Sequence, residues 1–472
     1  MKRVLITLGM LLLAAFGAAA QEVNAARLAL EDTTYINVEL GLLGETGVLK
    51  DVFTPDQRVM GTLEASSQRT VGKVGLYGRF GYGYDYGRGS TWRGWIDPYE
   101  TPFMLADSIP GPLSIEMYSM EAGAGFPLGG GWSAGLDMAY DVGLMAKHKD
   151  LRNKNTSMRF RITPGIYWQG EKVGLGLDLG YERNTERVEY SQESTSEEHM
   201  LFDIYGLWVG RAMGFSSAEN RRMKENDRFL GDFQLDLSLG NVSINNNLNL
   251  FWMRGVQTEV GYNNQQFGTT RSWTWIDDLE IQIGESHAIE ADFLFSTLQG
   301  FRPLQRQELD PASRIRVWVT YGDPVFCYWR RMHFEHLQYT YGTTWKLRFG
   351  LANESMSHAY TEYPHRFSQT TNSLLSSAGA DIPLGRQFVL SPWLAFEKAY
   401  GMVNDYAEEY QILAPLLEQW DFWDGDNWHG ALGLGWTAPS GRIYVQGRYA
   451  IMSNDVLSAF RHEAVLKVGF NF

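Results

Sequence analysis

The end of the chain alternates in a way that constrains the fold more than any other stretch. Every second residue from position 464 is apolar, and most residues between them are polar or small, with Val465 as the exception. Successive side chains of a β-strand point to opposite faces, so one face of this segment suits lipid and the other suits water. Chain ends usually fray, so an apolar last strand indicates that it closes a barrel against the first strand. The apolar set is Ala464, Leu466, Val468, Phe470 and Phe472.

The same alternation recurs along the whole chain, for example at residues 173–182, 231–239 and 442–451. A soluble antiparallel sandwich with one wet face is the alternative, but the number of similar strands favours a membrane barrel. The mean hydropathy is −0.28, and no apolar run in the sequence is long enough for the ~20-residue helical span that a membrane requires. These features predict an all-β, transmembrane antiparallel barrel and argue against a helical membrane protein.

Short turns predict the topology. Turn-forming residues occur at 71–73, 127–131, 169–172, 240–241, 284–286, 341–343, 383–386 and 438–441. If both chain ends lie in the periplasm, these turns imply about 18 strands, with a range of about 16 to 20. Two segments, 201–209 and 314–321, are expected to be structure inside outer loops, or else one further spanning pair. The long outer loops are expected at residues 88–111, 183–228, 254–270, 297–325, 355–369 and 401–427.

The first twenty residues predict a cleavable secretory signal peptide, because Lys2 and Arg3 precede an apolar run at 4–16 and a run of small residues at 18–20. Residues 21–32 are then a short periplasmic segment, and residues 33–472 form the barrel as one domain. The expected location is the outer membrane of a Gram-negative type of cell. Cys327, the only cysteine, can form no internal disulfide.

The chain is acidic, with a formal net charge of −14. This charge argues against binding to nucleic acid, which requires a basic surface. The expected partners are instead outer-membrane lipid and lipopolysaccharide, the barrel-assembly machinery, and a larger outer-membrane complex if the protein is an accessory subunit.

Charged residues of both signs are expected to face the lumen. They could select solutes, as rings of charge do in channels, or they could pair with one another and hold a filled lumen in shape. Both alternatives stay open. The basic residues in this set are Arg79, Arg159, Arg161, Lys346, Arg348, Arg442, Arg448 and Lys467. The acidic residues are Glu39, Asp137, Asp141, Asp178, Glu182, Asp232, Asp236, Asp278, Glu280, Glu290 and Asp292.

An aromatic and acidic segment near the end, residues 420–429, is a candidate binding surface. The rings of Trp420, Trp423 and Trp428 could stack on a sugar or an apolar solute. Asp424 and Asp426, with Asn427, could offer oxygen ligands to calcium, although their spacing does not match an EF-hand loop. The alternative is an aromatic girdle at the membrane interface with solvated acids above it.

No catalytic residue, metal site or cofactor is expected. His333 and His336 lie three residues apart on a predicted strand, so they point to opposite faces and cannot easily share a metal. The sequence also lacks a Gly-x-Ser-x-Gly motif. The expected function is passage or binding of a small solute. The alternatives are a non-conducting accessory subunit of an uptake or assembly complex and, with less support, a surface hydrolase.

The signal peptide, the strand pattern and the closing residues Leu466, Val468, Phe470 and Phe472 together resemble porin-like bacterial outer-membrane barrels. The closing residues resemble the assembly signal of such proteins. The lead-in at 24–27 resembles the Asn-Pro-Ala start of long-chain fatty-acid transporters, with an alanine in place of the proline. In that family the N-terminus folds into the barrel as a hatch; the alternative is that this segment merely leads to the first strand. The TonB-dependent transporter family carries a plug domain there, for which residues 21–32 leave no room.

Overall fold

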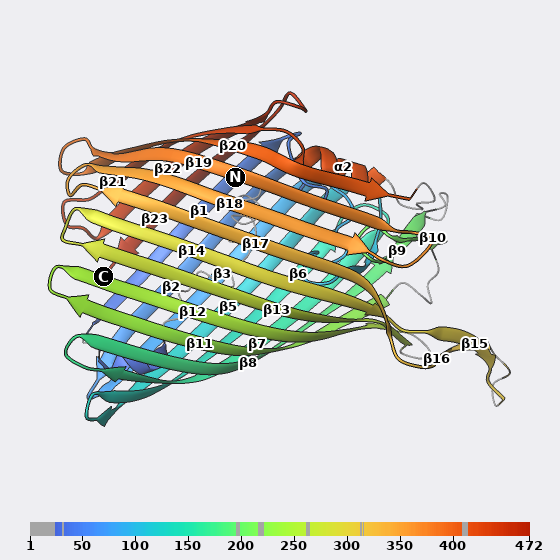
Figure 1. Ribbon diagram of the computed structural model, residues 1–472, viewed down its shortest axis with the longest axis horizontal. Coiled ribbons are helices and arrows are strands. Elements are labelled where there is room, and N and C mark those ends of the chain that lie inside the picture. The colour runs from blue at the N-terminus through green and yellow to red at the C-terminus, as the bar shows by residue number, and fades with distance from the viewer. Residues whose placement is uncertain are drawn as a thin grey trace.

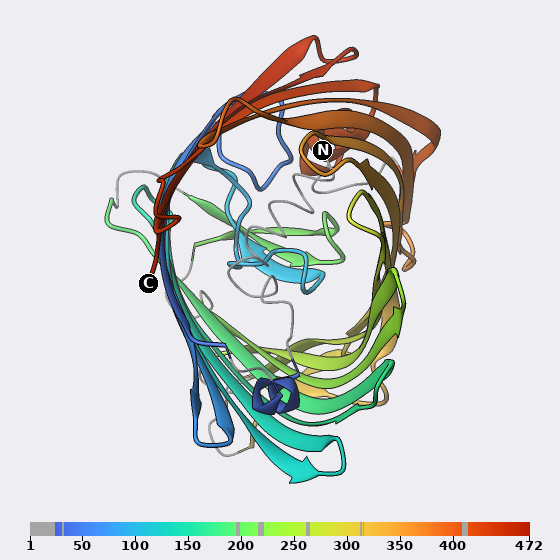
Figure 2. The same ribbon diagram turned by 90° about the vertical axis from the view of Figure 1, so that its left-hand side faces the viewer.

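The computed structural model describes residues 24–30, 33–194, 199–215, 221–260, 265–311, 314, 316–407 and 414–472. The predicted signal peptide and most of the segment that follows it lie outside these residues. The described residues form one closed, antiparallel barrel of eighteen strands (Figures 1 and 2). Each strand pairs with the barrel strands before and after it in the chain, and β1 pairs with β23 to close the cylinder. The predicted barrel of about 18 strands is confirmed.

The barrel strands are β1 (Tyr35–Gly47), β2 (Gln57–Val71), β3 (Val74–Ser90), β5 (Gly111–Gly129), β6 (Trp132–Lys147), β7 (Arg152–Gln169), β8 (Val173–Ser191), β11 (Arg221–Leu239), β12 (Val242–Glu259), β13 (Gln265–Ile283), β14 (His287–Arg302), β17 (Val325–Tyr341), β18 (Lys346–Tyr360), β19 (Phe367–Pro383), β20 (Phe388–Tyr406), β21 (Asn427–Thr437), β22 (Ile443–Asn454) and β23 (Ala459–Asn471). The predicted short turns join these strands at one end of the barrel, which we call the inner end. In barrels of this kind the short turns lie in the periplasm.

The outer wall carries a broad apolar surface. Leu177 and Leu179 on β8 are 43% and 61% exposed, and Leu466 on β23 is 45% exposed. A closed barrel has no free edge, so an apolar outer wall can be surrounded by lipid without unpaired backbone groups. In the described part of the chain, no helix is long and apolar enough to cross a membrane.

Several predicted loops are shorter than expected because the strands continue beyond the apolar band. β8 runs to Ser191 and β11 begins at Arg221, so much of the predicted loop 183–228 is strand. Between β12 and β13, only residues 260–264 separate the two strands. In these outer extensions polar residues occur on both strand faces, so the regular alternation that marks the lipid-facing part is absent.

Three short strands from two outer loops fold into the barrel. β4 (Phe103–Ala106), β9 (Met200–Tyr205) and β10 (Gly210–Gly214) form a separate sheet, which lies inside the ring of barrel strands in Figure 2. We call residues 91–110 and 199–215, which contain this sheet, the loop plug. The loop plug has a buried apolar core that includes Trp95 and Trp208, each no more than 1% exposed.

The other outer elements are a hairpin and a helix. β15 (Gln305–Leu309) and β16 (Arg316–Thr320) pair only with each other and project from the barrel (Figure 1). Together with the short strands of the loop plug, this hairpin confirms that segments 201–209 and 314–321 do not add barrel strands. Helix α2 (Ala414–Trp423) precedes β21.

The N-terminal 3₁₀-helix η1 (Ala25–Ala29) lies inside the barrel near the inner end (Figure 2). Glycines on the barrel wall make room for it: a Cβ at Gly135 would lie 2.1 Å from the Ala26 nitrogen, and one at Gly75 would lie 1.8 Å from the Leu28 oxygen. Asn24 donates from Nδ2 to the Ile166 carbonyl at 3.0 Å. The lead-in therefore docks against the inside of the barrel wall, and it does more than connect to β1.

Candidate functional site in the barrel lumen

A buried ion network fixes the loop plug in the outer half of the lumen. Lys224 on β11 is 1% exposed, and its Nζ lies 2.6 Å from Glu100 Oε2 in the loop plug. The same Nζ lies 3.1 Å from Glu186 Oε2 on β8. Glu186 also accepts from the Ile96 backbone nitrogen at 2.8 Å. Barrel wall and loop plug thus share one set of charge-assisted hydrogen bonds in a site shielded from water.

Two further buried ion pairs anchor the loop plug at other points. Arg222 Nη2 donates to Asp203 Oδ1 of β9 at 2.7 Å, and its guanidinium carbon lies 3.6 Å from the centroid of the Phe267 ring. Lys147 Nζ donates to Asp107 Oδ1 at 2.5 Å. Removing one partner of such a pair leaves a buried charge uncompensated, which is strongly destabilising.

The surroundings shift the pKa values of two acids in the loop plug, Glu100 and Asp107, in opposite directions. Burial disfavours the charged form of Glu100, but Lys224, Arg228 and Arg159 more than offset it and hold the pKa of Glu100 well below its ordinary value. Burial raises the pKa of Asp107, and Lys147 offsets only part of that effect. The carboxylate of Glu100 is therefore held in its ionised form more strongly than that of Asp107.

Helix α2 contacts the same structure from the opposite side of the barrel. Gln419 is 1% exposed, and its Oε1 accepts from the Val52 nitrogen at 3.2 Å. Its Nε2 donates to the hydroxyl of Tyr99 in the loop plug, also at 3.2 Å. The outer half of the lumen is thus filled by segments from several loops that hold one another.

The inner half contains a cavity of about 760 Å³. Its lining includes eight carboxylates but only two guanidinium groups, those of Arg27 and Arg79. The lining carboxylates are Glu64, Glu121, Asp137, Asp236, Asp278, Glu280, Glu290 and Asp292. The cavity is therefore strongly acidic, and η1 forms part of its wall.

The acidic character is concentrated on two neighbouring strands. Asp278 lies directly opposite Asp292, and Glu280 lies opposite Glu290, in the register of β13 and β14. We call these four residues the acid ladder. Within the described residues, none of the four forms an ion pair with a lysine or arginine. Asp292 Oδ2 lies 2.8 Å from His336 Nδ1. Like charges directly opposite on paired strands destabilise a sheet, so a bound cation would stabilise this arrangement.

The opposite wall is neutralised by its own ion pairs. Arg79 donates to Glu64 at 2.8 Å, and Arg161 lies 3.4 Å from Glu121 and 3.3 Å from Asp137. Both alternatives considered for the lumen charges thus have a place in the structure: one wall is held by paired charges, while the other has carboxylates in excess.

The structure places the remaining predicted lumen residues as follows. Asp178 and Asp232 are buried, Asp141 and Arg448 are half-buried, and Lys346 is exposed at the inner end. Three of the predicted basic residues have an acidic partner: Arg159 lies 3.7 Å from Glu182, Arg348 lies 2.6 Å from Asp381, and Lys467 lies 2.9 Å from Glu39. Arg442 is a correction: it lies in the turn before β22 and not on a strand wall, because the strand begins one residue later than the alternation indicates.

The predicted binding surface at residues 420–429 is not assembled as one surface. Trp423 is 5% exposed and packs inside, edge-on to His358, whereas Trp428 is 54% exposed and contacts Phe396 in a tilted arrangement with the ring centroids 4.7 Å apart. Trp420 is half-buried on α2. The end of the helix places Trp423 inside and the following strand exposes Trp428, which a linear sequence pattern does not reveal.

The two acids of that segment have structural partners. Asp426 accepts from Lys398 Nζ at 2.7 Å, and Asp424 Oδ1 accepts from the Gly425 nitrogen at 3.0 Å. Among the described residues, no group of three or more His, Cys, Asp or Glu side chains is placed to hold a metal ion. His333 and His336 have separate partners, Glu335 and Asp292.

The anchors of the loop plug were missed in the sequence. Lys224 and Arg222 lie in a stretch where residues on both strand faces are polar, so no alternation marks it as a strand. The available signal was the even spacing of Arg222, Lys224, Asn226 and Arg228, which places four polar side chains on one face of an extended segment.

These features define the class: an outer-membrane β-barrel whose outer half is filled by its own loops and whose inner half holds an acidic cavity. The chain belongs to the family described as "Family of unknown function (DUF6850)", which matches residues 25–472. The sequence matches no curated protein.

Solved structures with a similar outline are outer-membrane proteins of low identity. The copper transporter OprC is 7% identical, with a TM-score of 0.46 over 94% of this chain and 82% of that chain. The ferric-catecholate import receptor Fiu from E. coli K12, in its open form, is 8% identical, with a TM-score of 0.41 over 94% and 82%. The outer membrane transporter YddB from Escherichia coli is 7% identical, with a TM-score of 0.43 over 92% and 81%. Similarity at this level says nothing about what the present chain binds.

Proposed function

We propose that this protein binds a small cationic solute in the inner cavity and lets it cross the outer membrane when the loop plug moves. The observation that carries this proposal is the acid ladder, in which Asp278 faces Asp292 and Glu280 faces Glu290 on the cavity wall. A cation between the two strands would relieve the repulsion within both pairs. The cavity of about 760 Å³ is large enough for a small organic molecule.

Conductance in planar bilayers tests the proposal. The wild-type barrel should be mostly closed, because the loop plug fills the outer half of the lumen. A variant with a loosened plug, Lys224→Met, should conduct, and its reversal potential in a salt gradient should show cation selectivity. Adding Asp278→Asn and Asp292→Asn to that variant should reduce the selectivity.

The matched control is Glu285→Gln, which removes a carboxylate from the turn between β13 and β14, outside the cavity lining. It should leave selectivity unchanged in the Lys224→Met background. An anion-selective pore would contradict the proposed cationic solute. So would a cation selectivity that is unchanged by Asp278→Asn and Asp292→Asn.

The second candidate is a non-conducting accessory subunit. Its support is the number of buried contacts that fix the loop plug, including the Arg222–Asp203 and Lys147–Asp107 pairs. If the Lys224→Met variant also carries no current while it remains folded, the accessory function is favoured. A folded barrel is recognised by its heat-modifiable migration on a gel.

A further inference from the structure

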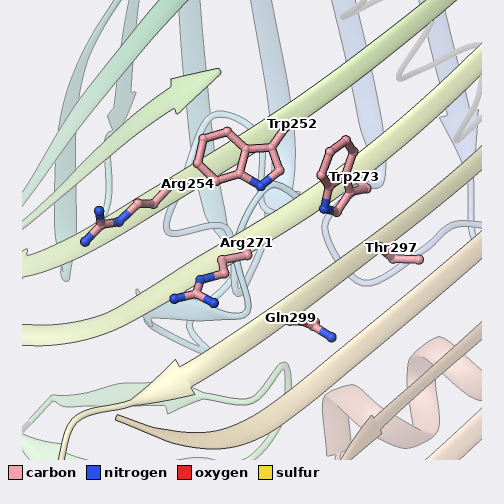
Figure 3. Close-up of a pocket in the computed structure, with 6 residues that line it drawn as sticks. All are labelled: Trp252, Arg254, Arg271, Trp273, Thr297 and Gln299. Carbon is pink, nitrogen blue, oxygen red and sulfur yellow. The ribbon is translucent and has the colours of Figure 1, made fainter. Parts of the chain in front are cut away.

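The outer wall of the barrel carries a groove with two tryptophans and two arginines. It has a volume of about 470 Å³ and is lined by Trp252, Arg254, Arg271, Trp273, Thr297 and Gln299 (Figure 3). These residues come from β12, β13 and β14, on the face of those strands that points away from the acid ladder. The groove therefore lies outside the lumen and is independent of the proposed function.

The height of the groove on the barrel matches a membrane interface. Trp252 is ten residues from Val242, the first residue of β12, and Trp273 is ten residues from Ile283, the last residue of β13. With a rise of about 3.4 Å per residue and a strand tilt of about 40°, both rings lie about 25 Å from the short turns. That height is close to the thickness of the apolar band of outer-membrane barrels, so the tryptophans lie at the outer boundary of the lipid.

The neighbouring residues support this placement. Tyr181, Phe229, Trp252 and Trp273 lie side by side on four adjacent strands, with ring centroids 5.6, 5.5 and 6.5 Å apart in that order. Next to this row on the inner side are apolar residues such as Leu179 and Leu250, both exposed. Next to it on the outer side are charged residues. The row is thus an aromatic girdle, the structure that marks the interface in membrane barrels.

The two arginines lie directly opposite each other on paired strands, Arg254 on β12 and Arg271 on β13. Both are exposed, and within the described residues neither forms an ion pair. The acid opposite Arg254 in the register, Asp227, is held by Arg183 at 3.0 Å and by the Tyr181 hydroxyl at 2.6 Å. Two like charges placed opposite each other destabilise a sheet unless an anion lies between them.

We infer that this groove binds the phosphorylated headgroup of a glycolipid in the outer leaflet, such as lipid A. The two guanidinium groups would donate to one phosphate, which suits their planar arrays of hydrogen-bond donors. The faces of Trp252 and Trp273 would contact the sugar or the first carbons of the acyl chains, which lie at the same level. A soluble anion would gain the arginine contacts but not the aromatic ones.

The test is the amount of phosphorylated glycolipid retained per barrel after purification from outer membranes, measured by mass spectrometry. The double variant Arg254→Gln with Arg271→Gln should retain at least about tenfold less glycolipid than the wild type, because charge-assisted hydrogen bonds to the phosphate are lost. Arg187→Gln is the matched control. It removes an exposed arginine from the outer face of β8, one that pairs with Glu189 and does not contact Asp227, and it should retain as much lipid as the wild type.

A second measurement needs no variant. The wild-type barrel in nanodiscs should bind lipid A at least about tenfold more tightly than the dephosphorylated lipid. Equal binding of the two lipids would overturn the inference, as would unchanged retention in the double variant. Inorganic phosphate that displaces lipid A at similar concentration would also overturn it, because the groove would then be a general anion site.

Discussion

Lys224 Nζ on the barrel wall lies 2.6 Å from Glu100 Oε2 in the loop plug, and the two residues are 124 positions apart in the sequence. Both side chains are buried, so each charge is stabilised by its protein partners and not by water. Replacing Lys224 with methionine leaves Glu100 and Glu186 without their shared cation. We expect the loop plug to be destabilised by about 3–5 kcal/mol while the barrel stays closed.

Limited proteolysis of the folded barrel checks this prediction. The variant should be cleaved within residues 91–110, where the wild type is protected. Arg306→Gln is the control, because Arg306 pairs with Glu308 on the projecting hairpin and is 63% exposed. An exposed pair contributes little, so this variant should be cleaved like the wild type. Cleavage that is equal in all three proteins would refute the role of Lys224.

The loop plug should also respond to acid. The pKa of Glu100 in the folded protein lies below its ordinary value, because Lys224, Arg228 and Arg159 outweigh the effect of burial. A depressed carboxylate pKa contributes stability above the unfolded value of about 4.3, and this stability is lost as pH falls through the folded pKa. Protection of residues 91–110 from an acid-stable protease should therefore decrease below about pH 4. In Glu100→Gln the protection should be lower at pH 7 and should change less with acid.

Docking of η1 depends on glycines of the barrel wall, where a side chain would collide with the helix. A Cβ at Gly135 would lie 2.1 Å from the Ala26 nitrogen, so Gly135→Ala should displace η1 at a cost of about 1–3 kcal/mol. Gly61→Ala is the control, because a Cβ there meets nothing within 4 Å. The measurement is the labelling rate of Ala26→Cys with a membrane-impermeant maleimide, against a background from the buried Cys327. Equal rates in both backgrounds would show that Gly135 does not hold η1.

The closing strand provides a test of the two barrel faces and of the predicted assembly signal. Val468 is on the lipid-facing side of β23, so Val468→Arg should reduce the folded fraction in outer-membrane extracts. The cost of such a charge is about 2–4 kcal/mol at mid-depth and less near the interface, and Val468 lies three residues from the inner end of β23. Lys467 points into the lumen, where it pairs with Glu39, so Lys467→Gln should cost less.

Deleting Phe472 tests the same strand at its end. The backbone of Phe472 exchanges two hydrogen bonds with Ile36, of 2.9 and 3.2 Å. We expect the deletion to slow insertion by the assembly machinery more than it destabilises a barrel that has already folded. The measurements are the rate of appearance of the folded form and the temperature at which it unfolds. A lower unfolding temperature with an unchanged rate would contradict this expectation.

The sequence predicted the part of the fold that depends on local patterns. Leu175, Leu177 and Leu179 alternate with glycines and Asp178, and this short local pattern is enough to indicate a strand with one lipid-facing side. Turns between such strands follow directly, and the strand number follows from the turns. The same residues fix the register, because a shift by one position would turn the leucines into the lumen.

The candidate site was harder to predict because it depends on distant segments. Nothing near Glu100 in the sequence indicates that Lys224 will neutralise it. Trp423 and Trp428 look alike in the sequence, but a helix end and a strand start separate them and turn one inward and the other outward. The four residues of the acid ladder were predicted to face the lumen; that they form two opposed pairs became visible only with the register of β13 and β14.

The pairing of β1 with β23 gives the barrel a single long-range seam. Asn37 and Asn471, hydrogen-bonded across it, are 434 positions apart, whereas most other strand pairs are joined by turns or single loops. Loop closure over this distance costs about 4 kcal/mol more entropy than a hairpin of a few residues. The seam should therefore form last, and its precursor is a curved open sheet with two bare edges. Until those edges meet, each can pair with the wrong chain, so the moment before closure is when this protein is most prone to aggregate.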